Sequence, residues 1–335
     1  MQKIKLVVMV IIPMIFSLSC KDGAYFYVGK IFAGHNPSEI VIQSRASYSR
    51  YVTITNDDNV FVETDNTQSI KVGIQPVGIA LWQKGDRFYV MNNGGLSISV
   101  IATSNNMIID SITDNSFHNM GDAVVTPDGS LLYVATDTNA ISIISTATDA
   151  VLQTFTDPSF EHPAHLIADV FDRYIFVSES DGNAVSVIST TTNTVLKTIG
   201  VGLSPNGMAE TTDGNWLFVV NSGSNSISVI NVGSLSLART VTDTSFDNPQ
   251  RIVLTPDCAY GFVSEYNSGN ISLISQNALI TGSGRAVVKD VYGGIKPYDL
   301  AIDDRGSSFP SVTAILKGEN AITDIEYIKI YGVCS

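Results

Sequence analysis

The sequence predicts an all-β fold, a seven-bladed β-propeller built of four-stranded antiparallel blades. Three observations predict it: a unit of about 40 residues recurs along the chain, its segments alternate as β-strands do, and no segment has a convincing helical period. A chain of 335 residues would suggest two domains by length alone. The repeat indicates a single one instead.

The fullest copy of the repeat runs from Leu203 to Thr242 and reads as four strands. Asp213-Gly214 marks the turn after the first strand, because glycine reaches positive φ without a Cβ clash. In the third strand Ile227 and Val229 alternate with serines, so we expect half-buried antiparallel strands. Seven copies predict seven blades, and they begin at Pro37, Pro76, Met120, Pro163, Pro205, Pro249 and Pro297.

The two ends of the chain are expected to complete one blade together. The last copy supplies three strands and stops one strand short. Residues 24–32 precede the first copy and have strand composition, with four aromatic residues in nine. We therefore predict that this segment is the outer strand of the last blade, which removes the two free edges of the ring. A single propeller would then occupy residues 24–335.

The second and third strands carry recurring motifs. An aromatic residue followed by valine recurs as in Tyr89-Val90 and Phe218-Val219, and the third strands repeat the pattern of Ile98-Ser99-Val100-Ile101. In these motifs the chain, clearly so from Val72 to Tyr292, resembles the YVTN-type β-propeller repeat proteins found at cell surfaces and in surface layers. The resemblance implies a propeller displayed at the cell surface. It implies no catalytic residue, because the family is functionally mixed.

The amino terminus resembles the signal peptide of a bacterial lipoprotein. Two lysines precede the apolar run 6–16, which is too short to span a bilayer, and Ser17-Leu18-Ser19 leads to Cys20. We expect residues 1–19 to be removed and Cys20 to be lipidated, anchoring the protein in the cell envelope, at the outer membrane or the cell surface. Because Ser17 stands where leucine is commonest, the alternative is ordinary cleavage that yields a secreted or periplasmic protein.

The net charge of the chain limits the kinds of partner that it can bind. The formal net charge is −13, and removal of residues 1–19 would take away two lysines and no acidic residue. Such a surface repels phosphate groups, so we expect no nucleic-acid partner. The expected partners are a membrane, through the lipid anchor, and a protein or glycan ligand.

A mostly polar position recurs two residues after the first residue of each copy of the repeat. Two apolar residues follow it in every copy. We expect it at the beginning of the innermost strands, around one mouth of the central channel, as a candidate site for a ligand or a divalent cation. The alternative is that these side chains are simply solvated in a wet channel. No other cofactor is expected. The set comprises Glu39, Asp122, His165, Arg251 and Asp299, with Gly78 and Gly207 in the two remaining blades.

A Thr-Asp-x-Ser-Phe connection precedes three of the blades. It places Phe117, Phe160 and Phe246 on loops, with His118 and His162 close behind. As recognition loops, these residues would form an exposed patch for a protein or glycan. As turns, each aspartate would bind backbone amides and each phenylalanine would fill the space between blades.

Two cysteines remain after Cys20. Cys258 occupies the turn between the first and second strands of the sixth blade, and Cys334 follows the third strand of the seventh. Both loops lie on the same face of neighbouring blades, so an oxidising compartment could link them. The alternative is two thiols that never meet. Neither the c-type haem motif nor a zinc-binding spacing is present.

The sequence contains no familiar catalytic motif, neither a Gly-x-Ser-x-Gly elbow nor a His-Glu-x-x-His pair. The leading hypothesis is a cell-envelope binding or scaffold module that presents one loop face to a protein, glycan or matrix ligand. The alternative is a hydrolase or lyase acting on a small molecule at the channel mouth, as in the lactonase-like and lyase propellers that the fold also resembles. Glu39, Asp122, Asp299 and His165 would then be the acid, base and metal candidates.

Overall fold

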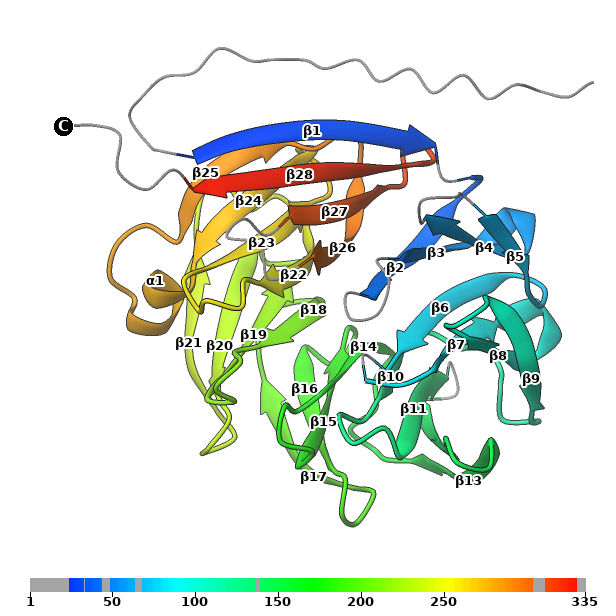
Figure 1. Cartoon of the computed structure of the whole chain (residues 1–335). Helices are drawn as coiled ribbons and strands as arrows, with labels where there is room; N and C mark the ends of the chain where they lie inside the picture. Colours follow the sequence, from blue (N-terminus) through cyan, green and yellow to red (C-terminus); the bar gives the residue numbers. More distant parts are fainter. Residues whose placement is uncertain are drawn as a thin grey trace, which may run out of the picture.

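The computed structural model describes residues 24–32, 34–43, 49–63, 68–82, 84–136, 139–303 and 311–329. Within them the chain forms seven antiparallel sheets arranged as blades around a common axis (Figure 1). This confirms the all-β propeller and its seven blades. The signal segment 1–19, Cys20 and Cys334 lie outside the described residues.

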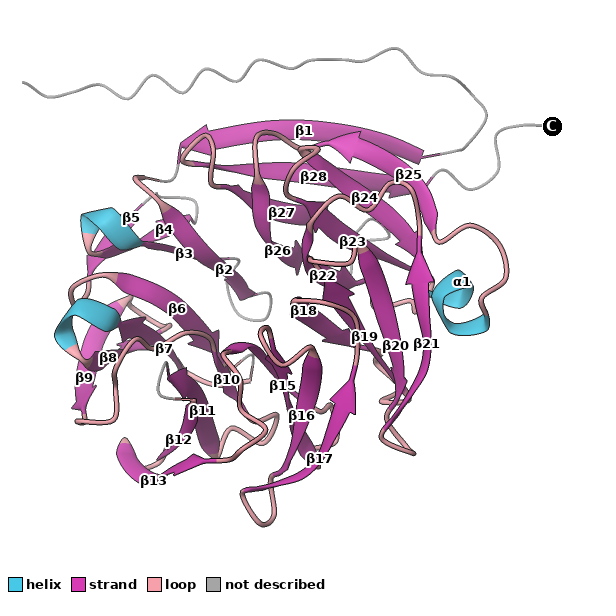
Figure 2. Ribbon diagram, turned by 180° about the vertical axis from the view of Figure 1, so that it is seen from behind, coloured by secondary structure: helices cyan, strands magenta, loops and turns pink. Residues whose placement is uncertain are grey.

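The strands follow one another from the axis outwards in each of the first six blades (Figures 1 and 2). Blade 1 contains β2 (Pro37–Gln43), β3 (Ser49–Ile54), β4 (Asn59–Glu63) and β5 (Gln68–Lys71). Blade 2 contains β6 (Pro76–Leu81), β7 (Arg87–Asn92), β8 (Ser97–Ala102) and β9 (Met107–Thr113). Blade 3 contains β10 (Ala123–Val125), β11 (Leu131–Thr136), β12 (Ala140–Ser145) and β13 (Ala150–Thr156).

The next three blades repeat this arrangement. Blade 4 contains β14 (Pro163–Ala168), β15 (Tyr174–Glu179), β16 (Ala184–Ser189) and β17 (Thr194–Gly200). Blade 5 contains β18 (Pro205–Glu210), β19 (Trp216–Asn221), β20 (Ser226–Asn231) and β21 (Ser236–Thr242). Blade 6 contains β22 (Pro249–Leu254), β23 (Tyr260–Glu265), β24 (Asn270–Ser275) and β25 (Val287–Tyr292).

The last blade contains β26 (Pro297–Asp303), β27 (Ser311–Leu316) and β28 (Ala321–Lys329). The N-terminal strand β1 (Ala24–Phe32) runs antiparallel to β28, from Ala24 opposite Lys329 to Phe32 opposite Ala321. Three short helices interrupt the strands: η1 (Thr55–Asp57), η2 (Asn93–Gly95) and α1 (Gln276–Thr281). At six residues, α1 is too short to show a helical period in the sequence.

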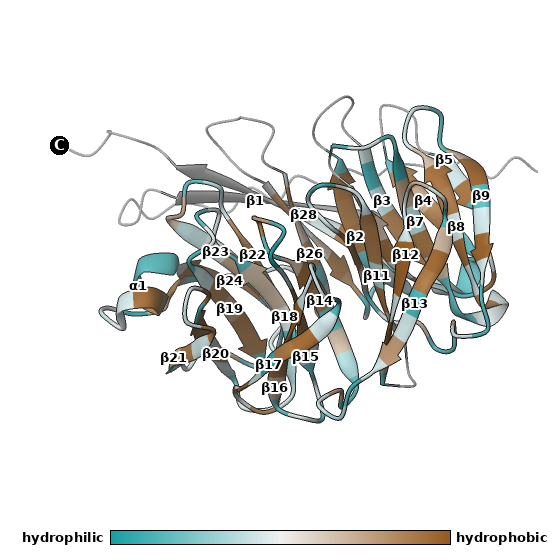
Figure 3. Ribbon diagram, turned by 90° about the horizontal axis from the view of Figure 1, so that it is seen from below, coloured by the Kyte–Doolittle hydropathy of each residue, from teal (hydrophilic) through white to brown (hydrophobic). Residues whose placement is uncertain are grey.

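The third strands differ from the prediction, because they are buried on both faces rather than half-buried. In β8, for example, Ile98, Val100 and Ile101 are buried together with Ser99. A neighbouring blade covers each face of the sheet, so the serines of the alternating pattern face the seams between blades. In Figure 3 hydrophobic residues accordingly dominate the strands.

Polar contacts also join the blades at the loop that precedes each innermost strand, which we call the lead-in loop. Asn183, Asn225 and Asn320 have positive φ, which asparagine tolerates better than most residues. Each accepts, through Oδ1, a hydrogen bond from the lead-in loop of the next blade. The bond from the amide of Asn36 to Asn320, at 3.0 Å, joins the first and last blades.

The seam between the first and last blades is packed as well as hydrogen-bonded. Ile40 and Val52 of blade 1 form one buried cluster with Ala301, Ile315 and Ile322 of blade 7. Burial of such side chains contributes about 25 cal/mol per Å² of apolar surface. The ring is thus continuous through its inner strands.

The outer strands of blades 2 to 6 share an irregularity. In each of these blades the register between the third and fourth strands shifts at the same place, for example between Ile143 and Ile144. The fourth strand holds one extra residue there, a β-bulge. Ile109, Leu152, Leu196 and Val288 are extra residues of this kind, and all four are exposed.

None of the helices in the described part of the chain has the length and apolarity needed to cross a membrane.

Candidate functional site: the channel axis and the loop face

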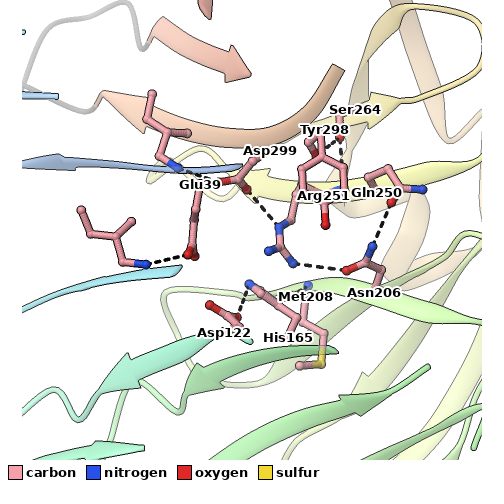
Figure 4. Close-up of polar contacts among 12 residues, drawn as sticks. Glu39, Asp122, His165, Asn206, Met208, Gln250, Arg251, Ser264, Tyr298 and Asp299 are labelled. Carbon is pink, nitrogen blue, oxygen red and sulfur yellow. Dashed lines mark hydrogen bonds and ion pairs between the residues drawn. The ribbon is translucent and has the colours of Figure 1, made fainter. Parts of the chain in front are cut away.

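The structure brings the five predicted channel residues together around the axis (Figure 4). Glu39, His165, Arg251 and Asp299 lie on the innermost strands of four blades, and Asp122 directly precedes the innermost strand of a fifth. Asp122, Arg251 and Asp299 are buried and the other two are half-buried. The set therefore lies at the axis as predicted, although it is less solvated than a wet channel mouth implied.

Four of the five side chains accept a hydrogen bond from the innermost strand of the next blade. The donor is in every case the backbone amide three residues after the start of that blade. The bonds are 2.7 Å from the Ile79 amide to Glu39 Oε2, 2.8 Å from Leu166 to Asp122 Oδ2, 3.1 Å from Met208 to His165 Nδ1, and 2.9 Å from Ile40 to Asp299 Oδ2. These residues therefore tie neighbouring blades together, which is a structural task.

Arg251 joins blades with its guanidinium instead. Its Nε donates to Asp299 Oδ1 of blade 7 at 2.9 Å, and its Nη1 donates to Asn206 Oδ1 of blade 5 at 3.3 Å. Burial by itself would lower the pKa of Arg251, but the carboxylates of Asp299 and Asp122 raise it above its ordinary value. The guanidinium therefore stays charged inside the ring.

The two glycines of the set stand where backbones approach closely. A Cβ on Gly78 would lie 2.6 Å from the carbonyl oxygen of Gly121. A Cβ on Gly207 would lie 2.7 Å from the carbonyl oxygen of Gln250 and from the Cα of Arg251. Both distances are shorter than real contacts allow, so these two seams have no room for a side chain.

The position of the proton on His165 follows from the contacts of its imidazole. His165 accepts the Met208 amide at Nδ1, so its proton is on Nε2, which lies 3.4 Å from Asp122 Oδ2. Burial, and then the charge of Arg251, hold the pKa of His165 well below its usual value. The imidazole is neutral at physiological pH.

Glu39 and Asp122 form a carboxyl pair. Burial raises the pKa of Glu39 well above its usual value, and the charges of Asp122 and Asp299 raise it further. Burial raises the pKa of Asp122 as well, while Arg251 and the Leu166 amide oppose that shift. Burial therefore favours a proton on this pair of carboxyls.

The predicted cation site is not formed. In the part of the chain that the structure describes, no three histidine, cysteine, aspartate or glutamate residues are grouped so that they could hold a metal ion. The physical reason is visible at Asp122, where one oxygen accepts the amide of Leu166 and the other the amide of Ala123. Oxygens turned towards backbone amides do not converge on a common point.

Of the two interpretations of the Thr-Asp-x-Ser-Phe connection, the structure supports the turn and not the exposed patch of phenylalanines. Phe117, Phe160 and Phe246 are 0%, 2% and 3% exposed, so they fill the space between blades. The aspartate of each motif accepts the amide two residues later, as at Asp157 and Ser159 (2.9 Å). Turn formation therefore explains the motif. His118 and His162 are exposed on the same loops.

Cys258 lies in the predicted turn of blade 6. Its φ of 58° corresponds to the positive φ of Gly129 and Gly214 in the equivalent turns. Its thiol is exposed, and Sγ lies 3.0 Å from Thr212 Oγ1. Because Cys334 lies outside the described residues, a disulfide between the two cysteines stays a prediction.

The last residue of the second strand was not among the predicted site residues in any blade. In blades 4 and 6 this residue is a buried glutamate, Glu179 or Glu265, whereas in blades 2 and 5 it is a buried asparagine, Asn92 or Asn221. Aligning the second strands would have revealed a polar residue at this position in blades 2 to 6. Only the structure shows that its side chain turns inwards.

No family model matches the chain, and no curated protein matches it either. Membership of the YVTN-type family therefore stays a prediction. Among solved structures, "Kuenenia stuttgartiensis Hydrazine Synthase" is similar, with a TM-score of 0.74 over 88% of this chain and 96% of that chain, at 16% sequence identity. A likeness at this identity shows the fold alone: this chain is a seven-bladed β-propeller similar to the propeller of that protein.

Proposed function

We propose that the protein is a binding module of the cell envelope, anchored through a lipid on Cys20, which presents its lead-in loops to a protein, glycan or matrix ligand. The observation that carries the proposal is the contrast between the axis and these loops. At the axis the charged side chains hold neighbouring blades together, whereas on the loops a varied set of side chains is solvent-exposed.

The exposed set occupies one equivalent position, two residues before the start of each blade. Three of its members are apolar and unusually accessible: Ile74 is 56% exposed, Leu203 55% and Ile295 50%. Loops that bind ligands typically present different side chains from equivalent positions of a rigid scaffold. The seven members are His35, Ile74, His118, Glu161, Leu203, Asp247 and Ile295, of which all but the half-buried Asp247 are exposed.

The position of the N-terminal strand indicates how the face that carries the lead-in loops is oriented relative to the membrane. We propose that β1 closes the ring as the outer strand of the last blade, and its pairing with β28 along its whole length supports this. An outer strand ends next to the lead-in loops, so Ala24 lies at the opposite face. Only three residues separate Ala24 from Cys20, so the two residues are at most roughly 14 Å apart. The lipid would therefore hold the opposite face near the membrane and leave the lead-in loops pointing away.

Photo-crosslinking in intact envelopes tests the assignment of the face. Replacing Ile74, Leu203 and Ile295 together by serine is expected to abolish most crosslinking to the ligand. The matched control is Phe171→Ser, which removes a residue that is 59% exposed in the loop between β14 and β15, on the opposite face. Equal crosslinking by the triple variant and the control would refute the proposed binding face.

The anchor and the closure have separate tests. Cys20→Ala should release the protein from membranes, and a variant that stays in the membrane fraction would contradict the anchor. Deletion of residues 24–32 from the unanchored protein should expose the amides of β28 to hydrogen exchange. Unchanged protection of β28 would contradict closure by β1.

A second candidate function is a hydrolase or lyase at the channel mouth. One observation favours it: the buried carboxyls of Glu39 and Asp122 both have a raised pKa, and Nε2 of the neutral His165 lies 3.4 Å from Asp122 Oδ2. Such an arrangement supplies a general acid and a general base. If turnover of a panel of lactones is found, Glu39→Gln should abolish it while the fold is retained. Turnover that survives this change would exclude the pair as the reacting groups.

A further inference from the structure

The lead-in loops of blades 4, 5 and 6 each donate a hydrogen bond to the last residue of the second strand, and the donor in blade 5 lies one position earlier in its loop than in blades 4 and 6. In blade 5, Asn221 Oδ1 accepts the amide of Gly202 at 3.1 Å. In blade 4, Glu179 Oε2 accepts the amide of Glu161 at 2.9 Å. In blade 6, Glu265 Oε2 accepts the amide of Asp247 at 2.7 Å. Two of these three loops are thus held by a group that titrates, and one by a group that does not.

The two glutamates are fully buried. Both are 0% exposed, and the second oxygen of each, Oε1, has no hydrogen-bond partner among the described residues. An ionised carboxylate in such a place forgoes most of its hydration, which is far more unfavourable for the charged form than for the neutral one. The asparagine of blade 5 avoids this problem, because its amide group is neutral at every pH.

Acidic groups surround both glutamates. Asp157 and Glu161 of the lead-in loop face Glu179, together with the hydroxyl of Ser186 on β16. On the same loop His162 Nδ1 is 2.8 Å from Ser180 Oγ and 3.9 Å from Asp181 Oδ2. Burial therefore acts together with two like charges, and it raises the pKa of Glu179 to about 7.

The surroundings of Glu265 are similar. Asp247 of the lead-in loop and Asp290 of β25 face it, together with the hydroxyl of Ser272 on β24. Asp290 in turn accepts hydrogen bonds from Ser272 and from Ser245 of the lead-in loop, both at 2.8 Å. Burial raises the pKa of Glu265 to about 8.

We infer that Glu179 and Glu265 are protonation-controlled latches, which hold the lead-in loops 157–162 and 243–248 closed when protonated and release them when ionised. The hydrogen bond from the loop amide by itself favours the ionised carboxyl. The raised pKa of each glutamate shows that burial and repulsion by the neighbouring acidic groups outweigh this effect. An ionised carboxylate is stable only when water can hydrate it. Displacement of the lead-in loop lets water reach the carboxylate. For Glu179, a rise in pKa from 4.5 to about 7 corresponds to loop opening that is roughly 300-fold more favourable above pH 7 than below pH 4.5.

Hydrogen exchange of backbone amides between pH 5.5 and 9 tests this inference on the mature chain, without any ligand. After correction for the intrinsic exchange rate, protection of the amides of Glu161 and Asp247 should fall at least tenfold as pH rises. Protection of the Gly202 amide in blade 5 should stay constant. A parallel fall at Gly202, or constant protection at all three amides, would overturn the inference.

Matched variants separate the latch from general loosening of the fold. Glu179→Gln keeps the hydrogen-bond acceptor and removes the charge, so the Glu161 amide should lose its pH dependence while the Asp247 amide keeps it. Asn221→Glu should create the same dependence at Gly202. Because the two changes act in opposite directions, the second still tests the inference if the first fails to fold. A pH dependence that persists in Glu179→Gln would contradict it. The readout is independent of the proposed binding function.

Discussion

The channel axis and the lead-in face have polar residues of the same types, yet the surrounding protein uses them differently. At the axis Glu39, Asp122 and His165 each accept an amide of the next blade, and burial changes their protonation. On the lead-in face Glu161 and His162 are exposed, and the equivalent positions of other blades hold different residue types. In this propeller, residue type alone therefore does not show whether a polar side chain joins two blades or faces solvent. The direction of the neighbouring backbone amides does.

The largest effect should come from breaking the buried ion pair at the axis. Asp299→Ala removes the partner of Arg251 and the acceptor of the Ile40 amide, so it leaves a buried charge and a buried donor unsatisfied. We expect a loss of about 3–5 kcal/mol in the free energy of unfolding, measured by urea denaturation. The control Asp86→Ala removes a carboxylate that is 80% exposed, and it should change the stability by less than about 0.5 kcal/mol. Equal effects of the two changes would show that the axis is no more sensitive than the surface.

An intermediate effect should come from pH. Burial raises the pKa of Glu179 to about 7 and those of Glu210 and Glu265 to about 8, all above the ordinary 4.5 of glutamate. The folded state therefore binds more protons than the unfolded state between these values, so stability should fall as pH rises from about 5 to 8. The lowered pKa of His165 acts in the opposite direction, and only below pH 6.5.

Thermal unfolding at pH 5.5, 7 and 9 measures this dependence. The midpoint should be highest at pH 5.5, and the fall towards pH 9 should be shallower in a Glu179→Gln, Glu265→Gln double variant. A midpoint that rises steadily to pH 9 would show that the buried carboxyls do not control stability in this range.

The smallest effect should come from the lead-in face. Leu203→Ser removes an exposed side chain, so the free energy of unfolding should change by no more than about 0.5 kcal/mol in urea titration. Met208→Ser, five residues along on the innermost strand, replaces a buried side chain and should lower it by about 2 kcal/mol or more. If both changes are equally damaging, the loop is part of the folded frame rather than an open recognition surface.

The sequence was sufficient for the parts of the structure that repeat. Seven starts fixed the blade count, and the register within each copy placed Glu39, Asp122, His165, Arg251 and Asp299 together, because equivalent positions of a circular repeat must lie around one axis. What these residues contact could not be predicted, since the partners lie far away in the sequence. The amides that donate to Glu39, Asp122 and His165 lie about 40 residues further along the chain, and the amide that donates to Asp299 lies near its beginning. The burial of Phe117 could not be predicted either, because the Thr-Asp-x-Ser-Phe motif is compatible with a buried turn and with an exposed patch.

The bulge in the outer strand of blades 2 to 6 has a consequence for how molecules meet one another. A straight outer edge offers a row of unpaired amides and carbonyls on which the chain of a neighbour can continue the sheet. An extra residue bends that row, so an incoming chain finds its partners out of step after one or two hydrogen bonds. Copies that meet along the rims of these five blades would therefore separate again instead of extending one another's sheets.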